Sequence, residues 1–249
     1  METNPFRAYR DLGGHAPGSS APPARASAWV AERVAGKSWK VRAPLLLILA
    51  WMLHGYLGDP AYRSIFEGVN LGFHEAGHAA FMWLGSRILT VAGGTIFQLG
   101  IPVVAGVYLL RKQGDPFGAA VCVFWLGTAL AGAGVYASDA RAQALPLVSP
   151  FGPVDVDSHD WTFMLMKYGV LSRDQEIGAM LRGAGLLSMM LSLLAGAWVL
   201  RVMARTTVGP PGRAQPPEPT APPAEPLRPA EPPAPAPPRF RSYLDPDEG

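Results

Sequence analysis

The sequence predicts an all-α, multi-pass helical membrane protein with four spanning helices, a further membrane helix that carries two histidines, and disordered tails. Four apolar runs approach or exceed the length of about 20 residues that a helix needs to cross a bilayer. Of the 249 residues, 49% are hydrophobic and only 16% are charged. The mean hydropathy of +0.15 understates the apolar part, because both ends of the chain are polar. A soluble helical protein would need four runs of membrane length by coincidence.

Residues 1–42 are expected to form a disordered, basic N-terminal segment that ends in a collar of cationic residues. The membrane-embedded domain then extends over residues 43–205. Its clearest spans are the runs 43–58, 88–110 and 117–137 and a last run that ends near Arg201 and Arg205. Gly127, Gly132 and Gly134 in the third run permit close contact between helices.

The stretch between the third and the last run is polar. It predicts a short amphipathic helix over residues 160–168 and a second helix that begins near Ser172, where Gln175 three residues later fits a capping box. From residue 206 onward, proline, alanine and glutamate dominate. This composition predicts a disordered, Pro-rich tail that could dock a partner, although a solvated tail is the simpler interpretation.

The distribution of basic residues bears on the topology. Clusters precede the first run, lie at Arg111 and Lys112, and end the last run. The positive-inside rule places all three in the cytoplasm if four runs cross and the histidine segment enters and leaves on one side. If the histidine segment crosses fully, Arg111, Lys112 and the tail fall outside.

Charge and cysteine content exclude other classes. The net charge of +2 is too small for nucleic-acid binding. The single cysteine, Cys122, allows neither an intramolecular disulfide nor a thiolate zinc cluster.

The segment 70–85 contains the motif H-E-A-G-H in apolar surroundings. His74 and His78, four residues apart, lie on one helix face and can bind one ion, while Glu75 lies beside them. Ionisable groups in membrane segments are rare and usually functional. We expect a Zn²⁺ site in which Glu75 is the general base that accepts a proton from the attacking water and delivers it to the leaving amine.

Catalytic zinc usually has a third protein ligand, which the motif does not fix. His159, in D-V-D-S-H-D-W, is the first candidate and Asp139 a close second. Asp157 or Asp160 could orient an imidazole. The other histidines, His15 and His54, lie in the N-terminal segment and in the first run.

The helix with His74, Glu75 and His78, followed by the stretch G-G-T-I-F-Q-L-G-I-P, resembles the site-2-protease-like membrane zinc metallopeptidases. That family takes an aspartate ligand from an N-x-x-P-x-x-x-x-D-G type motif, whereas Asp139 is followed by Ala140 and Arg141. The stretches F-H-E-A-G-H-A-A-F, S-D-A-R-A-Q-A-L-P-L and H-D-W-T-F-M-L also resemble a group of uncharacterised bacterial membrane proteins, which implies a multi-pass protein of the bacterial inner membrane.

The expected function is therefore a membrane-embedded, zinc-dependent endopeptidase that hydrolyses peptide bonds within or next to the bilayer. Its partners would be the lipid bilayer and a membrane or membrane-associated protein substrate. The alternative is a non-catalytic membrane scaffold or chaperone whose zinc holds helices together. A transporter would need more polar residues along the spans than Gln98.

Overall fold

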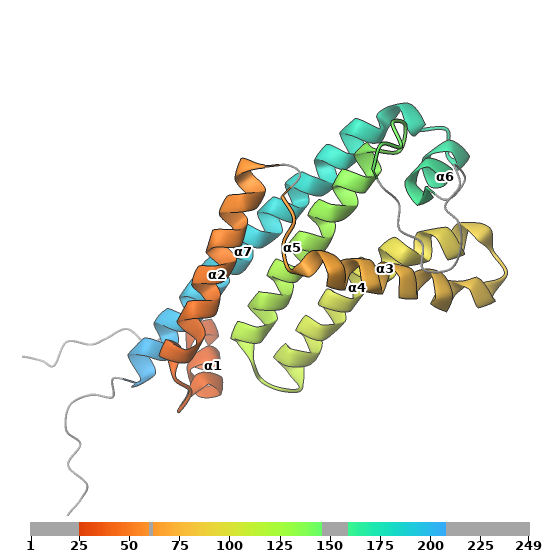
Figure 1. Ribbon diagram of the computed structural model, residues 1–249. Coiled ribbons are helices and arrows are strands. Elements are labelled where there is room, and N and C mark those ends of the chain that lie inside the picture. The colour runs from red at the N-terminus through yellow and green to blue at the C-terminus, as the bar shows by residue number, and fades with distance from the viewer. Residues whose placement is uncertain (1–24, 60–61, 146–158, 208–249) are drawn as a thin grey trace, which may run out of the picture. The chain divides into compact units, whose positions relative to one another are not determined.

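A computed structural model describes residues 25–59, 62–145 and 159–207, and this part of the chain is helical and contains no strand (Figure 1). It confirms the predicted all-α class. The elements, in chain order, are α1 Arg25–Val34, α2 Trp39–Gly58, α3 Phe66–Phe81, the 3₁₀ turn η2 Met82–Leu84, α4 Arg87–Arg111, α5 Pro116–Ser138, α6 Asp160–Lys167, the 3₁₀ turn η4 Leu171–Arg173, and α7 Asp174–Thr207.

Four helical segments are long and apolar enough to cross a membrane, namely α2, α4, α5 and residues 171–206, which comprise η4 and nearly all of α7. They match the four predicted runs, so the protein has a multi-pass membrane architecture. The two helices predicted between residues 172 and 204 are one continuous helix, α7. Ser172 does not cap it; the Asp174 carboxylate instead accepts a hydrogen bond from the backbone N–H of Gln175.

Helices α5 and α7 pack antiparallel through small residues spaced seven apart. A methyl group on Gly127 would lie 2.7 Å from the carbonyl oxygen of Gly185, and one on Gly134 would lie at the same distance from that of Gly178. Ser192, seven residues after Gly185 on α7, donates a hydrogen bond to the carbonyl of Ala120, seven residues before Gly127 on α5. The predicted close contact is thus confirmed for Gly127 and Gly134.

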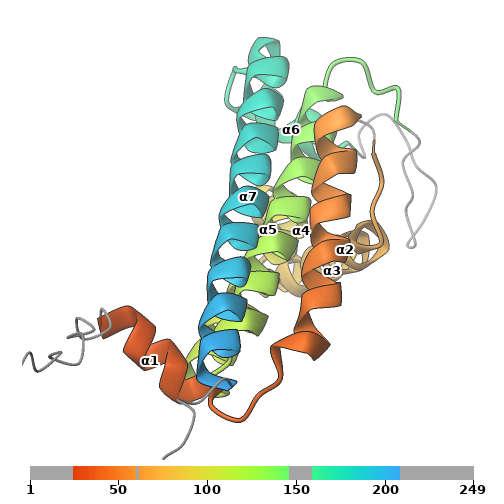
Figure 2. The same ribbon diagram turned by 90° about the vertical axis from the view of Figure 1, so that its left-hand side faces the viewer.

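Helix α2 lies beside this pair, as Figure 2 shows, and its buried face contributes Leu49, Met52 and Leu53 to a core with Phe124 and Met189. The short helix α1 differs from the expected disordered segment 1–42. Its buried residues Val30 and Val34 join Phe117 of α5 and Val199 and Met203 of α7 in a second core. Residues 1–24 and 208–249 lie outside the described residues; of the predicted tail 206–249, only residues 206 and 207 are described, and they end α7.

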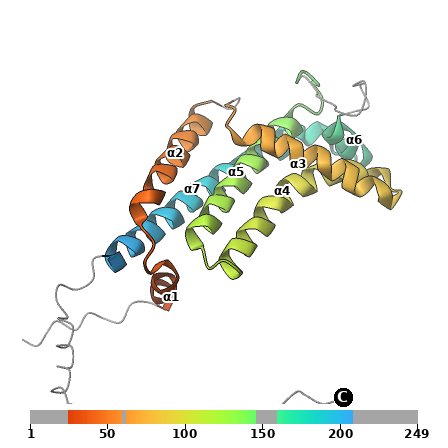
Figure 3. The ribbon, with the colours of Figure 1, turned by 60° about the horizontal axis from the view of Figure 1, so that its bottom comes forward.

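Helices α3 and α4 form a hairpin beside α5 (Figure 3). Its turn passes through Gly85, whose φ of 66° favours glycine. Two hydrogen bonds join the first half of α3 to α5: Trp125 donates its indole N–H to the amide oxygen of Asn70, and Asn70 donates to the hydroxyl of Thr128. These bonds fix the rotation of α3 about its axis, and with it the direction of its histidines.

Candidate metal centre

The two histidines of α3 lie one helical turn apart and face the same point. Their ring centroids are 4.7 Å apart, with the ring planes at 82° to each other. His74 is buried and His78 is partly buried. Each ring directs its Nε2 atom toward the same carboxylate oxygen, Oδ2 of Asp160. The i, i+4 spacing therefore places both rings on one face of the helix, as the sequence predicted.

The other ring nitrogen of each histidine, Nδ1, already has a hydrogen-bond partner. The Nδ1 of His78 lies 2.9 Å from the backbone carbonyl of Thr90, which can only accept, so this nitrogen must carry a proton. The Nδ1 of His74 lies 3.0 Å from Oε1 of Gln98, whose own NH₂ group donates to the Ala129 carbonyl. Both neutral imidazoles therefore keep their lone pairs on Nε2, which is the orientation that metal-binding histidines usually receive from their outer partners.

Asp160, at the start of α6, completes the group. Its Oδ2 lies 2.8 Å from Nε2 of His74 and 3.1 Å from Nε2 of His78. The three residues form a candidate metal-binding group whose ligand atoms lie within 4.8 Å of one another. Both Nδ1–H groups donate to other partners, so Nε2 of His74, Nε2 of His78 and Oδ2 of Asp160 are three acceptor atoms that face one point. Acceptor atoms can lie this close together only when a proton or another cation lies between them.

A proton or a metal ion can supply this positive charge. Burial alone would lower the pKa of His78, but the adjacent Asp160 carboxylate outweighs it and raises that pKa above its usual value. A proton shared by His78 and Asp160 would occupy the place of an ion. Because ligands must lose their protons to bind a metal, proton and ion compete for this place.

Glycines in α3 and α4 make room for the two rings. A methyl group on Gly94 would lie 2.6 Å from Nε2 of His78 and 2.8 Å from Cε1 of His74. Nearby, a methyl group on Gly77 would collide with the backbone carbonyl of Gly93. The close approach of the two helices is what brings Thr90 and Gln98 within reach of the rings.

Glu75 is partly buried and has no hydrogen bond or ion pair with the described part of the chain. Its charge helps raise the pKa of His78, so the carboxylate lies near the centre without contacting the ligand atoms. A carboxylate next to a candidate metal site and free of partners can accept a proton from a water molecule held there.

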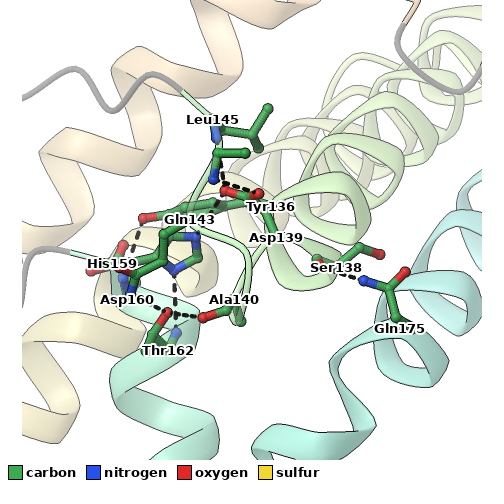
Figure 4. A network of polar contacts seen from close by, with 11 residues as sticks. Tyr136, Ser138, Asp139, Ala140, Gln143, Leu145, His159, Asp160, Thr162 and Gln175 are labelled. Atoms are coloured by element: carbon green, nitrogen blue, oxygen red, sulfur yellow. Dashed lines mark hydrogen bonds and ion pairs between the residues drawn. The ribbon is translucent and has the colours of Figure 1, made fainter. Parts of the chain in front are cut away.

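A polar network holds α6 in place (Figure 4). The backbone N–H of Asp160 donates to the hydroxyl of Tyr136 on α5 at 3.2 Å. Thr162 donates its hydroxyl proton to the carbonyl of Ala140, and its own oxygen accepts a bond from Gln143. The end of α5 and the loop after it therefore fix the position of the Asp160 carboxylate.

The structure places Asp160, rather than His159 or Asp139, beside the two histidines of α3. His159 caps α6: its Nδ1 accepts a hydrogen bond from the backbone N–H of Thr162 at 3.2 Å. Its Nε2 lies 3.6 Å from Oδ2 of Asp139. The Asp139 carboxylate accepts the backbone N–H groups of Ala144 and Leu145 and so shapes the loop.

The remaining candidates lie apart from the cluster or outside the description. His54 is exposed on α2. His15 and Asp157 lie outside the described residues. Gln98 and Tyr136 contact the cluster but were not predicted as site residues. The signal for Gln98 was present, since it is a polar residue in the middle of an apolar run.

Comparisons with protein-family models, with curated proteins and with solved structures found no match for this chain.

Proposed function

We propose that the protein is a membrane-embedded, zinc-dependent endopeptidase of the bacterial inner membrane that hydrolyses peptide bonds within or next to the bilayer. The observation that carries the proposal is the meeting of three acceptor atoms, from His74, His78 and Asp160, near Glu75, whose carboxylate has no partner among the described residues. Its substrate would be a membrane or membrane-associated protein.

The donor set fits zinc. Two imidazole nitrogens and one carboxylate oxygen, with no thiolate, form a common catalytic zinc site that leaves the fourth position open. Bound zinc would supply an activated water at neutral pH and a positive charge for the substrate carbonyl. The residues that hold it would be His74, His78 and Asp160, with Gln98 and the Thr90 carbonyl keeping both rings in the correct tautomer.

Glu75 would move the protons. It accepts a proton as the oxygen of water forms a bond to the carbonyl carbon, and it delivers that proton to the amine nitrogen as the carbon–nitrogen bond breaks. Its lack of a partner among the described residues leaves it available for both steps. Peptide hydrolysis is favoured by analogy with other sites of this arrangement.

One observation favours the alternative of a scaffold. His74 and Asp160 are 86 residues apart in sequence, so an ion held by both would also tie α3 to α6. The two functions differ at Glu75, because a scaffold needs the ligands but not the base.

Metal content tests the site. In detergent-purified protein supplied with zinc, mass spectrometry should find one zinc per chain in the wild type and in Glu75→Gln, and little in His74→Ala or Asp160→Ala. His54→Ala is the matched control, since it removes an exposed histidine from a neighbouring helix and should keep the ion. A wild type that folds but holds no zinc would contradict the proposal.

Mapping of new protein N-termini tests the reaction without knowledge of the substrate. Membranes of cells that produce the wild type should contain cleavage products that are missing from cells with Glu75→Gln. Identical N-termini in both, with zinc bound in both, would favour the scaffold.

A further inference from the structure

The two ends of the helix bundle differ in charge. One end, here called the basic end, comprises residues 25–42, 111–115 and 201–205. These short segments contain nine cationic and two acidic residues: Arg25, Arg33, Lys37, Lys40, Arg42, Arg111, Lys112, Arg201 and Arg205, with Glu32 and Asp115. The remaining described segments contain six cationic and seven acidic residues: Arg63, Arg87, Arg141, Lys167, Arg173 and Arg182, with Asp59, Glu67, Glu75, Asp139, Asp160, Asp174 and Glu176.

Contacts show that the three basic segments lie together. Arg42 near the start of α2 donates to Asp115 before α5, at 2.6 Å. The core that contains Val34 and Met203 joins α1 to the end of α7. The start of α2, the end of α4, the start of α5 and the end of α7 are therefore at one end of the bundle, as Figure 1 shows.

The metal centre lies toward the other end. Asp160 is bonded to Tyr136, which is 20 residues after Pro116 on α5. At 1.5 Å per residue, this distance along the helix is about 30 Å, the thickness of the hydrocarbon core. At the same end, Arg141 pairs with Asp174 at the start of α7, so one of the six cations there is neutralised by a buried acid.

The number of crossings is consistent with this arrangement. Helix α2 runs from the basic end to the centre end, and α4 returns to the basic end. Between them, the first half of α3 lies beside the middle of α5, where Asn70 contacts Trp125 and Thr128. From there α3 runs toward the centre end and finishes next to the start of α4, where His78 contacts Thr90. Helices α5 and α7 repeat the pair of crossings. The histidine helix therefore enters and leaves on one side, the first of the two topologies considered from the sequence.

Lysine and arginine in short segments next to spanning helices are retained in the cytoplasm. From the concentration of these residues at the basic end, we propose that the metal centre opens on the extracytoplasmic side of the membrane and takes its substrate there. The substrate would be an extracytoplasmic peptide segment next to the outer leaflet. This last step rests on the proposed peptidase function, whereas the orientation of the centre does not.

Cysteine labelling tests the orientation. The only native cysteine, Cys122, is buried on α5 and can be replaced by serine to give a cysteine-free background. Gln113→Cys at the basic end and Ser172→Cys at the centre end place thiols at exposed, uncharged positions, so the cationic residues stay unchanged. A membrane-impermeant maleimide is applied to spheroplasts and, separately, to disrupted membranes.

We expect Ser172→Cys to react in intact spheroplasts and Gln113→Cys to react only after disruption, with at least a tenfold difference in labelling. The reverse pattern, or equal labelling of both in intact spheroplasts, would overturn the proposal. Zinc content measured on the same samples reports separately on the metal site. If cleavages that depend on Glu75 are found only in cytoplasmic segments of other proteins, the assignment of the substrate is overturned even though the orientation holds.

Discussion

The sharpest prediction concerns the glycine under the two histidine rings. In Gly94→Ala, the added methyl group would lie 2.6–2.8 Å from atoms of His78 and His74. Nonbonded carbon atoms keep about 3.5 Å or more apart. The rings must therefore move by about 0.7–0.9 Å, whereas metal–ligand distances tolerate only about 0.2 Å. The backbone of Gly94 is packed against α3 and cannot yield easily.

We expect this displacement to weaken zinc binding by at least about 100-fold, which is about 2.8 kcal/mol. Competition with a fluorescent zinc chelator, applied to the detergent-purified protein, measures the affinity. Gly100→Ala is the matched control: it changes the same residue type on the same helix, but its methyl group meets nothing within 4 Å. This control should bind zinc as the wild type does.

The reasoning would be refuted if Gly94→Ala kept the affinity of the wild type while its circular dichroism showed an unchanged helix content. A loss of helix content in Gly94→Ala would instead report on packing, and the zinc affinity of this variant would then be measured at a lower temperature at which its helix content is that of the wild type. Equal losses in both glycine variants would also contradict the argument, because only one of them faces the rings.

Three further predictions address the surroundings of the site and the membrane helices. Gln98→Leu removes the acceptor for Nδ1–H of His74, so zinc affinity should fall by about 10- to 100-fold in the chelator assay; an unchanged affinity would show that the amide does not orient the ring. Gly185→Ala forces a methyl group to within 2.6 Å of a facing carbonyl and should cost about 1–3 kcal/mol of stability in thermal unfolding, whereas Gly183→Ala, in open space, should cost nothing. Burial alone would raise the pKa of Asp115, but its hydrogen bond with the guanidinium of Arg42 outweighs burial and lowers that pKa. The Arg42–Asp115 pair therefore stabilises the fold above pH about 4, and this stabilisation is lost as the pH falls through the lowered pKa. Thermal unfolding between pH 6 and pH 3 should therefore show a smaller acid-dependent loss in Asp115→Asn than in the wild type.

The spans could be predicted from the sequence because their signal is local. A continuous apolar run of about 20 residues is sufficient evidence for a spanning helix. The run from residue 88 to 110 became α4 with one residue added at each end. Helix α1 was missed because its evidence is not local: Val30 and Val34 become buried only in a core with residues of α5 and α7.

That His74 and His78 face one point could also be predicted, since helix geometry fixes the relation of the two residues. The third member of the cluster could not be chosen from His159, Asp160 and their neighbours. Adjacent residues at a helix start differ in direction, and the difference here is that His159 has an extended backbone and caps α6, while Asp160 begins the helix and faces α3. The capping role of His159 depends on where α6 starts, and sequence patterns locate helix ends poorly.

The separation of the ligands along the chain also determines when the site can exist during synthesis. His74 leaves the ribosome 86 residues before Asp160. At about 5–20 residues per second, the histidine pair waits about 4–17 s for its carboxylate. For the proposed zinc site, a nascent chain therefore offers only two ring nitrogens, which would bind metal weakly. Full affinity would arise after α5 has been made and α6 has docked on it, so zinc loading would be a late step of biogenesis that follows synthesis of the first three spans.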